Sequence, residues 1–361
     1  MKVAKTENWI FHLAMLALAF TALVSCQAEE KATKKTSPVA KVPPSTVALG
    51  SCAHQRKSQP IWDSILEKSP ELFLFLGDNV YADTEDMDEM RAAYAMLAEH
   101  EGYQRMKETC PILAIWDDHD YGVNDGGAEY PMREGAQKVF NEFFETPENS
   151  PVRKRPGIYD ARYFEEGGKR LQVLLLDTRY FRGPMVLLPK RGRNGPYDRN
   201  LDPEVTVLGG AQWKWLEEEL QRPADIRIIA TSIQFLPVDH NWELWQNFPH
   251  ERQRMLDLLR ETKTGPVLFV SGDRHMGELM ELPAGDKQSP GSPIYEMTTS
   301  GLTNAGGGQK GEPNRYRVSP TNFQSRNFGL LQIDWATQLV TMQLCDIDGK
   351  VVDEYKADLS Q

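Results

Sequence analysis

The chain has 361 residues, of which 40% are hydrophobic and 26% charged, and its formal net charge is −11 at pH 7. This acidic balance argues against non-specific binding of nucleic acid, which requires a basic surface, and suits a protein that attracts divalent cations. Residues 46–361 are numerous enough to bury a large core. Because they contain no second linker and no internal repeat, we assign them to one α/β domain.

The N-terminal segment, residues 1–26, is typical of a lipoprotein signal peptide. Lysines precede an apolar stretch, Ile10 to Val24, which is too short to argue for a permanent membrane span. A Leu-Val-Ser-Cys lipobox predicts cleavage and a lipid on Cys26, and ordinary secretion is the alternative. Gln27 in place of aspartate favours the outer membrane. Residues 27–45 predict a disordered linker, so we expect an exported domain, lipid-anchored in the cell envelope and facing the periplasm or the exterior.

The clearest strand signal is the apolar run Leu72–Leu76, which suits a strand buried on both faces. Gly77 then allows a turn, and Asp78 and Tyr81 follow at the carboxyl end, where open α/β sheets place their sites. A carboxylate and a phenolate together favour a hard divalent or trivalent cation. The alternative is that Asp78 caps the next helix and Tyr81 packs on the sheet.

Beyond the lipobox the chain has an odd number of cysteines. Cys52, Cys110 and Cys345 cannot all pair within one chain, so at least one is a free thiol. Cys52 ends the stretch 47–52, a short predicted strand with a Gly turn, and the same arrangement precedes Asp78. We therefore favour Cys52 as a metal ligand. A buried thiol and a Cys52–Cys110 disulfide are the alternatives.

A third predicted strand, 111–116, leads into a dense cluster of charged residues. The run 117–120 is Asp-Asp-His-Asp and includes Asp118 and His119, and Asn124 follows in a Gly-rich loop. Like charges this close repel one another unless a ligand binds among them. The cluster therefore predicts further ligands, with a solvated acidic loop as the alternative.

A fourth predicted strand, 266–271, ends in a Gly turn followed by Asp273 and His275. An Asp-x-His spacing lets a carboxylate and an imidazole project to one side of an extended turn, and histidine is the commonest side-chain metal ligand. A surface salt bridge with a capping histidine is the alternative, and it explains poorly why a fourth strand should end in this way.

The rest of the domain alternates between amphipathic helices and apolar strands, and Thr84 is the expected N-cap of its second helix. Helices are predicted at 58–68, 84–99, 135–144, 210–221 and 249–262, and further strands at 157–164, 170–176, 227–233, 278–282, 294–299, 329–334 and 339–346.

Arginines and two long loops complete the set of candidate features. Arg179 and Arg182 follow the strand 170–176, where they can hold a phosphate oxygen in a fork or equally pair with nearby acids. Residues 181–208 show no clear periodicity, and a loop of that length is often a lid or a specificity loop. The Gly-rich stretch 300–308 predicts a simple loop, with a backbone phosphate cradle as the alternative.

Taken in chain order, these motifs resemble those of the PhoD-like alkaline phosphatases of the metallophosphatase superfamily. The motifs are Gly50-Ser51-Cys52, Gly77-Asp78 with Tyr81, Trp116-Asp117-Asp118-His119-Asp120 with Asn124, Asp177-Thr178-Arg179, Gly272-Asp273-Arg274-His275, and Thr299-Ser300-Gly301-Leu302-Thr303. The matches cover most of the predicted mature chain. The chain is short for that family, and its lipoprotein-type signal differs from the family's usual export signal.

The resemblance implies a fold, two metals and a set of ligands. The fold is a four-layer sandwich of two mixed β-sheets packed face to face and flanked by helices, and the metals are Fe(3+) and Ca(2+). Carried over by position, the iron ligands are Cys52, Asp78, Tyr81 and His275, while Asp118, Asn124 and Asp273 hold calcium and Asp78 bridges the two ions. The catalytic candidates are Asp118, Arg179 and His119, the last to stabilise the transition state or protonate the leaving group.

The expected reaction is hydrolysis of a small-molecule or polymer phosphate ester by a metal-bound hydroxide, without a phosphoenzyme. One alternative is a phosphodiesterase or phospholipase D-like activity on phospholipid or teichoic-acid-like polymers. Another is a catalytically inactive surface-binding lipoprotein. The sequence predicts no nucleic-acid-binding module and does not predict the natural substrate or the oligomeric state.

Overall fold

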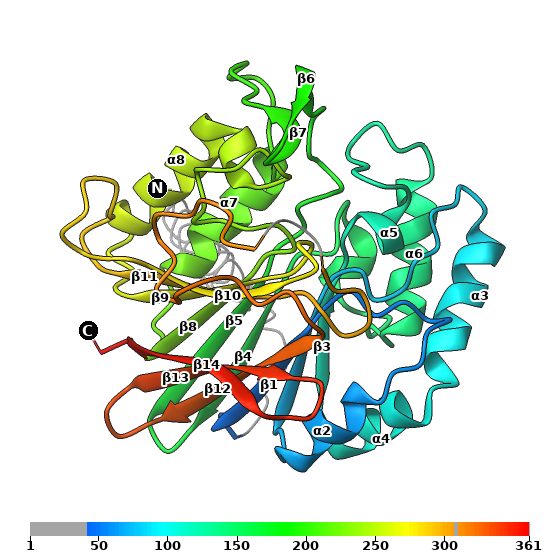
Figure 1. The fold of residues 1–361 in the computed structure, drawn as a ribbon, viewed down its shortest axis with the longest axis horizontal. Coiled ribbons are helices and arrows are strands. Elements are labelled where there is room, and N and C mark those ends of the chain that lie inside the picture. The colour runs from blue at the N-terminus through cyan, green and yellow to red at the C-terminus, as the bar shows by residue number, and fades with distance from the viewer. Residues whose placement is uncertain (1–41, 307–309, 361) are drawn as a thin grey trace, which may run out of the picture. The chain divides into compact units, whose positions relative to one another are not determined.

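The computed structural model describes residues 42–306 and 310–360, and its strands form two six-stranded sheets and one two-stranded hairpin (Figure 1). The predicted signal peptide with its lipid on Cys26, and residues 27–41 of the predicted linker, lie outside the described residues. Within the described ranges, every helix is too short or too polar to cross a membrane.

The chain packs on the domain slightly earlier than the sequence predicts. Pro43 and Pro44, which belong to the predicted linker, are buried. The carbonyl oxygen of Pro44 accepts a hydrogen bond of 3.2 Å from Trp335 Nε1. This contact joins the residues before the first strand to a turn near the carboxyl terminus.

The first sheet is mixed and has the order β14-β13-β12-β1-β2-β3. Its strands are β1 (Thr46–Gly50), β2 (Leu72–Leu76), β3 (Ile112–Ile115), β12 (Asn327–Asp334), β13 (Leu339–Asp346) and β14 (Val351–Asp358). β1, β2 and β3 run parallel, and the other three strands join β1 as an antiparallel series. The sequence predicts all of these strands except β14, whose side chains are mostly exposed and form no apolar run.

The second sheet is also mixed and has the order β10-β11-β9-β8-β5-β4. Its strands are β4 (Asp160–Glu166), β5 (Lys169–Leu175), β8 (Ile226–Ala230), β9 (Val267–Ser271), β10 (Gly277–Leu282) and β11 (Ile294–Thr299). The four central strands are parallel, and the edge strands β10 and β4 are antiparallel to their neighbours. All six strands match predicted strands.

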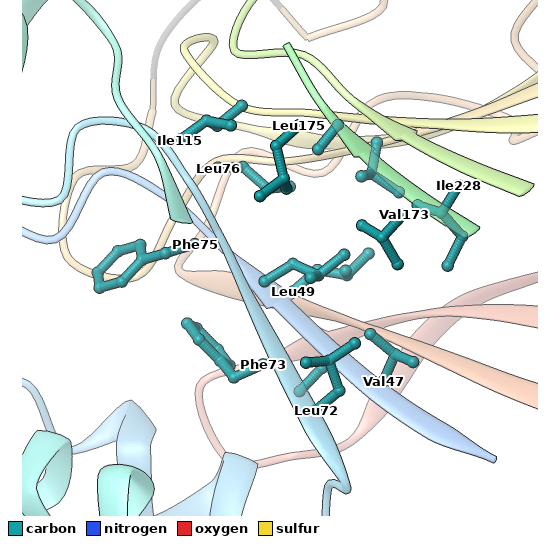
Figure 2. Close-up of a cluster of buried hydrophobic side chains, with 14 of the residues drawn as sticks. Val47, Leu49, Leu72, Phe73, Phe75, Leu76, Ile115, Val173, Leu175 and Ile228 are labelled. Atoms are coloured by element: carbon teal, nitrogen blue, oxygen red, sulfur yellow. The ribbon is translucent and has the colours of Figure 1, made fainter. Parts of the chain in front are cut away.

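The two sheets pack face to face around a shared apolar core (Figure 2). Val47 and Leu49 of β1 lie opposite Val173 of β5, and Leu76 of β2 lies near Leu175. Their side chains are almost fully buried. Because side chains alternate along a strand, each inner strand sends every second residue into this core and the others outward.

Helices cover the outer faces and complete a four-layer arrangement, as the resemblance implies. They are α2 (Ile61–Glu67), α3 (Met87–Ala98), α4 (Glu101–Thr109), α5 (Asp118–Tyr121), α6 (Arg133–Phe143), α7 (Gly209–Leu220) and α8 (Pro249–Glu261), with 3-10 helices at Pro151–Lys154 and Trp245–Asn247. On the first sheet, Phe73 and Phe75 meet the Trp62 ring of α2 at centroid distances of 5.3 and 6.0 Å. On the second, Trp213 of α7 and Met255 of α8 join a separate apolar cluster.

One local prediction is wrong, and two local elements were not predicted. Asp86, rather than Thr84, is the N-cap of α3, because its side chain accepts hydrogen bonds from the first-turn amides. The polar helix α4 was not predicted, because few of its residues are apolar. Residues 181–208 contain a hairpin of β6 (Val186–Gly192) and β7 (Gly195–Asp198), whose exposed side chains do not alternate in polarity.

The shared core predicts how much stability is lost when one of its side chains is shortened. Leu74→Ala in β2 removes a fully buried side chain and should lower the free energy of unfolding by about 2–5 kcal/mol. Leu201→Ala is the matched control, because Leu201 is 75% exposed and its loss should change stability by less than about 0.5 kcal/mol. Urea denaturation followed by circular dichroism measures both, and equal losses would contradict the assignment of Leu74 to the core.

Candidate metal centre

The carboxyl ends of strands from both sheets meet at one place. Gly272, directly after β9, shows how closely they approach, because a Cβ atom there would lie 2.7 Å from the carbonyl oxygen of Leu76 and 2.7 Å from Ser51 Oγ. Only glycine fits this contact without movement of its neighbours. The close approach places the residues that follow β1, β2 and β9 around one point.

Many of the residues at this point have a strained backbone. Cys52, Asp78, Asp273 and His275 all have positive φ angles, of 61°, 50°, 65° and 52°. Residues other than glycine rarely adopt this left-handed backbone conformation. Backbone strain of this kind is concentrated at functional sites. These four residues follow β1, β2 and β9 and are residues for which the sequence predicts ligands.

The four residues assigned to iron by resemblance lie together. Cys52 Sγ is 3.3 Å from Asp78 Oδ2, and the Tyr81 hydroxyl is 3.0 Å from the same oxygen. The Tyr81 hydroxyl is also 2.9 Å from His275 Nε2. The ligand atoms of Cys52, Asp78 and His275 all lie within 4.8 Å of one another, which is close enough for one ion to bind them.

A second group of possible ligands shares Asp78 with the first. The ligand atoms of Asp78, Asp118 and His119 also lie within 4.8 Å of one another. Asn124 and Asp273, the other residues assigned to calcium, belong to neither close group but line the same cavity. Asn124 is exposed and its side chain donates to Asp125 Oδ2 at 2.8 Å. Asp78 is therefore placed where a bridging ligand would lie.

The electrostatics of the centre fit a bound cation. Asp78 Oδ1 and Asp118 Oδ1 are buried and accept no hydrogen bond from the described residues. Burial, with the neighbouring Cys52 and Asp118, raises the pKa of Asp78 well above its ordinary value, and burial raises the pKa of the Cys52 thiol to about 11. Burial lowers the pKa of His275 to about 4, which favours the neutral imidazole that binds metals. A positive ion would offset the cost of burying these acids.

His119 is held by a residue that the sequence did not single out. Its Nδ1 is 2.7 Å from Asp83 Oδ1, and its ring lies 4.3 Å from the Tyr81 ring between centroids. Burial disfavours the charged imidazole, but the hydrogen bond to Asp83 and the charge of Asp118 outweigh burial and raise the pKa of His119 to about 10. Asp83 ends the stretch that begins at Leu72, but its spacing from His119 in the sequence gave no signal of the contact.

Arg179 does not line the cavity, which corrects its assignment as a residue that contacts substrate. It is fully buried, and its guanidinium donates to Asp117 Oδ1 at 2.6 Å and to Glu243 Oε1 at 2.9 Å. Arg182 is equally buried and pairs with Glu243 at 3.1 Å. The sequence left two roles open for the arginines, binding a phosphate oxygen or pairing with acids. In the structure both arginines pair with acids.

Arg179 nevertheless affects the centre through its charge. Its Nη2 lies 3.9 Å from Asp118 Oδ1. Burial alone would raise the pKa of Asp118, but the charges of Arg179 and His119 outweigh burial and lower the pKa to about 2. The backbone amide of Asp125 also donates to Asp118 Oδ2 at 2.6 Å. The pKa of Asp118 is therefore lowered beside Asp78, whose pKa is raised.

Ser300 and Thr303, at the start of the Gly-rich stretch after β11, contact Cys52 and His275. Ser300 Oγ lies 3.1 Å from Cys52 Sγ and accepts a hydrogen bond of 2.7 Å from the His275 amide. The amide of Thr303 donates to the carbonyl oxygen of Cys52. Cys52, Cys110 and Cys345 are all free thiols, so a Cys52–Cys110 disulfide is excluded for this structure.

A cavity of about 500 Å³ opens over the candidate ligands. Its floor includes Asp78, Asp118, His119, Asn124, Asp273 and His275. Its walls include Leu187 and Arg191 of the β6–β7 hairpin, and Trp242. Trp242 is fixed by a 2.7 Å hydrogen bond from its Nε1 to Glu312, a buried acid that also pairs with Arg274 at 2.9 Å. Leu187 and Arg191 lie in residues 181–208, for which the sequence suggested a lid or a specificity loop, whereas the sequence gave no signal for Trp242.

Known proteins share this sequence pattern and this fold. The family model for PhoD-like phosphatase matches residues 47–344. Alkaline phosphatase D of Bacillus subtilis (strain 168) is 22% identical over 314 residues, which cover 75% of this chain and 53% of that protein. This chain therefore spans about half the length of that curated relative.

Solved structures agree on the fold. A structure of PhoD has a TM-score of 0.70 at 17% identity, and the match covers 89% of this chain and 70% of that chain. A dimetal phosphatase from Danio rerio has a TM-score of 0.50 at 12% identity and covers 88% of this chain and all of that chain. At these identities the two structures establish the fold alone.

The centre predicts a difference between two buried thiols. Cys52→Ser should reduce the affinity for the ion held with Asp78 and His275 at least about tenfold, because a thiolate ligand is lost. Cys345→Ser is the matched control, because Cys345 is also a fully buried free thiol but lies on β13, outside the close groups. Plasma mass spectrometry of the purified chains measures bound metal, and equal metal content in both variants would contradict the assignment.

Proposed function

This chain belongs to the PhoD-like phosphatase family, and from that membership we propose that it hydrolyses phosphate esters with bound metal ions. The observation that carries the proposal is the position of Asp78, which lines the cavity and lies close to Cys52 and His275 and also close to Asp118. A shared carboxylate between two ligand groups is the arrangement expected of a two-metal phosphoester hydrolase. The fit of buried, unpartnered carboxylate oxygens to a cation supports it.

We assign Fe(3+) to Cys52, Asp78, Tyr81 and His275, and Ca(2+) to the carboxylate side of the cavity. Thiolate and phenolate donors favour a strongly Lewis-acidic ion, whereas hard oxygen donors suit calcium. The calcium ligands in this proposal are Asp78, Asp118, Asn124 and Asp273. When bound, the two ions lower the pKa of a water molecule and offset the charge that develops on the phosphoryl oxygens.

His119 is the proposed proton donor to the leaving group. It lines the cavity beside Asp118, and its Nδ1 is occupied by Asp83, which leaves Nε2 for the substrate. Asp83 fixes the ring orientation and acts as a positioning residue. Arg179 has a positioning role as well, because it is buried among acids and holds the segment that contains Asp118.

A phosphodiester is the second candidate substrate. The cavity is large, and the β6–β7 hairpin extends one of its walls, so the second ester group of a diester has room to extend along that wall. An inactive binding protein is disfavoured, because the full set of candidate ligands is intact and mostly within contact distance. We propose that the domain is exported and held by a lipid on Cys26.

Removal of the shared carboxylate should abolish turnover. Asp78→Asn should lower kcat/KM for both mono- and bis-(p-nitrophenyl) phosphate about a thousandfold, which corresponds to about 4 kcal/mol of transition-state stabilisation. Asp348→Asn is the control, because Asp348 is an exposed acid in a turn. A chelator should reproduce the loss in the parent chain. Full turnover by Asp78→Asn would refute the proposed function.

The role of His119 predicts a dependence on the leaving group. His119→Gln should slow hydrolysis of an alkyl phosphate about a hundredfold and should affect the p-nitrophenyl ester much less, since p-nitrophenolate leaves without a proton. Asp83→Asn should shift the two rates in the same direction by a smaller factor. His100→Gln is the control, because His100 bonds the Gln55 carbonyl oxygen outside the cavity. Equal losses on both esters would exclude proton donation.

A further inference from the structure

The β6–β7 hairpin exposes unusually large apolar side chains beside the cavity. Leu187 is 68% exposed and Val186 is 39% exposed. Leu201, just after β7, is 75% exposed, and a hydrogen bond of 3.1 Å from Asn200 to Pro184 holds it near the base of the hairpin. Leu201 and Leu187 are the two most exposed large hydrophobic residues in the part of the chain that the structure describes. Val186 and Leu187 are adjacent in β6, and Leu187 lines the cavity, so exposed apolar side chains lie beside the candidate site.

The same hairpin carries a local positive charge on an acidic protein. Lys190, Arg191 and Arg193 are exposed toward its tip, and the one acid of the hairpin is Asp198, which pairs with Val186 at the base. The whole chain has a net charge of −11. A basic tip with adjacent leucine and valine is therefore complementary to a surface that is both anionic and apolar at shallow depth.

The second strand of the hairpin, β7, is fixed to the wall of the cavity, including at the end that carries the turn. The amide of Tyr197 donates to the carbonyl oxygen of Asn241 at 2.9 Å. Gly195 has a φ of 122°, and a Cβ atom there would lie 2.1 Å from the carbonyl carbon of Asn241, so the two segments pack backbone to backbone. Leu187 and Arg191 line the cavity itself. Figure 1 shows β6 and β7 at the edge of the ribbon, away from the two sheets.

From these features we infer that the hairpin is a docking element for an anionic lipid surface and brings the cavity to lipid headgroups. Leu187 and Val186 enter the apolar boundary of the lipid layer, while Lys190 and Arg193 contact the headgroup phosphates. Because β7 is fixed to the wall of the cavity, the cavity beside the hairpin then faces the same headgroups. The substrate class that follows, a lipid phosphate ester, rests on the proposed function.

The combination of basic and exposed apolar side chains favours a lipid surface over a soluble anionic polymer. A polymer would bind the basic residues but would gain nothing from exposed leucine and valine. A lipid layer accommodates both kinds of side chain, because its headgroups are charged and its boundary is apolar.

Two matched labels test the docking directly. In the full chain with Cys26→Ser, an environment-sensitive fluorophore is attached to Val186→Cys or to Val352→Cys. These positions are 39% and 37% exposed on strands, and the remaining described cysteines are buried. With phosphatidylglycerol vesicles, the label at 186 should shift to the blue and the label at 352 should not. Phosphatidylcholine vesicles should shift neither.

A charge reversal outside the cavity lining adds a second measurement. Lys190→Glu should lower the partition of the Val186→Cys label into phosphatidylglycerol vesicles at least about fivefold, because each basic residue near an anionic surface contributes on that order. It should leave turnover of soluble p-nitrophenyl phosphate, a monoester, unchanged. Turnover of phosphatidylglycerol in vesicles should fall with the partition.

The outcomes separate this inference from the proposed function. No blue shift at position 186, with normal turnover of soluble esters, would overturn the docking and leave the enzyme intact. Equal shifts at 186 and 352, or tight binding of dextran sulfate without vesicle binding, would also overturn it. A specific shift at 186 in a protein that hydrolyses no ester would support the docking and overturn the proposed function instead.

Discussion

Carboxylates that would repel one another are buried together in this protein, and much of the surrounding structure exists to hold them there. Asp78 accepts hydrogen bonds from Cys52 and Tyr81 on one oxygen and keeps the other without a donor. Asp118 and Asp273 line the same cavity. Burial of uncompensated charge is costly, so this arrangement is stable only with protons or cations among the acids. The buried acids must therefore bind either protons or cations, and the proposed chemistry follows from the binding of cations.

A second set of buried charges surrounds the first and is already neutralised. Arg179 and Arg182 pair with Asp117 and Glu243, and all four side chains are almost fully excluded from solvent. Such pairs contribute little net stability, but each partner is costly to leave alone, so together they fix the geometry around Asp118. Groups of this kind orient the ligands that contact an ion. The arginines thus contact the acids around the centre and do not line the cavity.

The fold separates a rigid floor from an exposed rim. The floor is built from residues directly after β1, β2, β3 and β9, and these strands belong to two sheets that share one apolar core. The rim is built from the β6–β7 hairpin and the segment around Trp242. Loops carried by a rigid scaffold can vary without disturbing the chemistry below them. Differences in substrate within this fold are therefore expected to arise at the rim.

The sequence by itself determined the strands of the two sheets, except for β14, and the residues of the floor. Buried strands are marked by apolar runs and their ends by glycine and acids, and these are local patterns. Only the tertiary structure decided the roles of Asp83, Glu243 and Ser300, and moved Arg179 from the cavity to an ion-pair network. It also formed the hairpin in a segment without periodicity. The physical reason is that these contacts join residues far apart in the chain, and no local pattern of polarity encodes which distant partner a side chain meets.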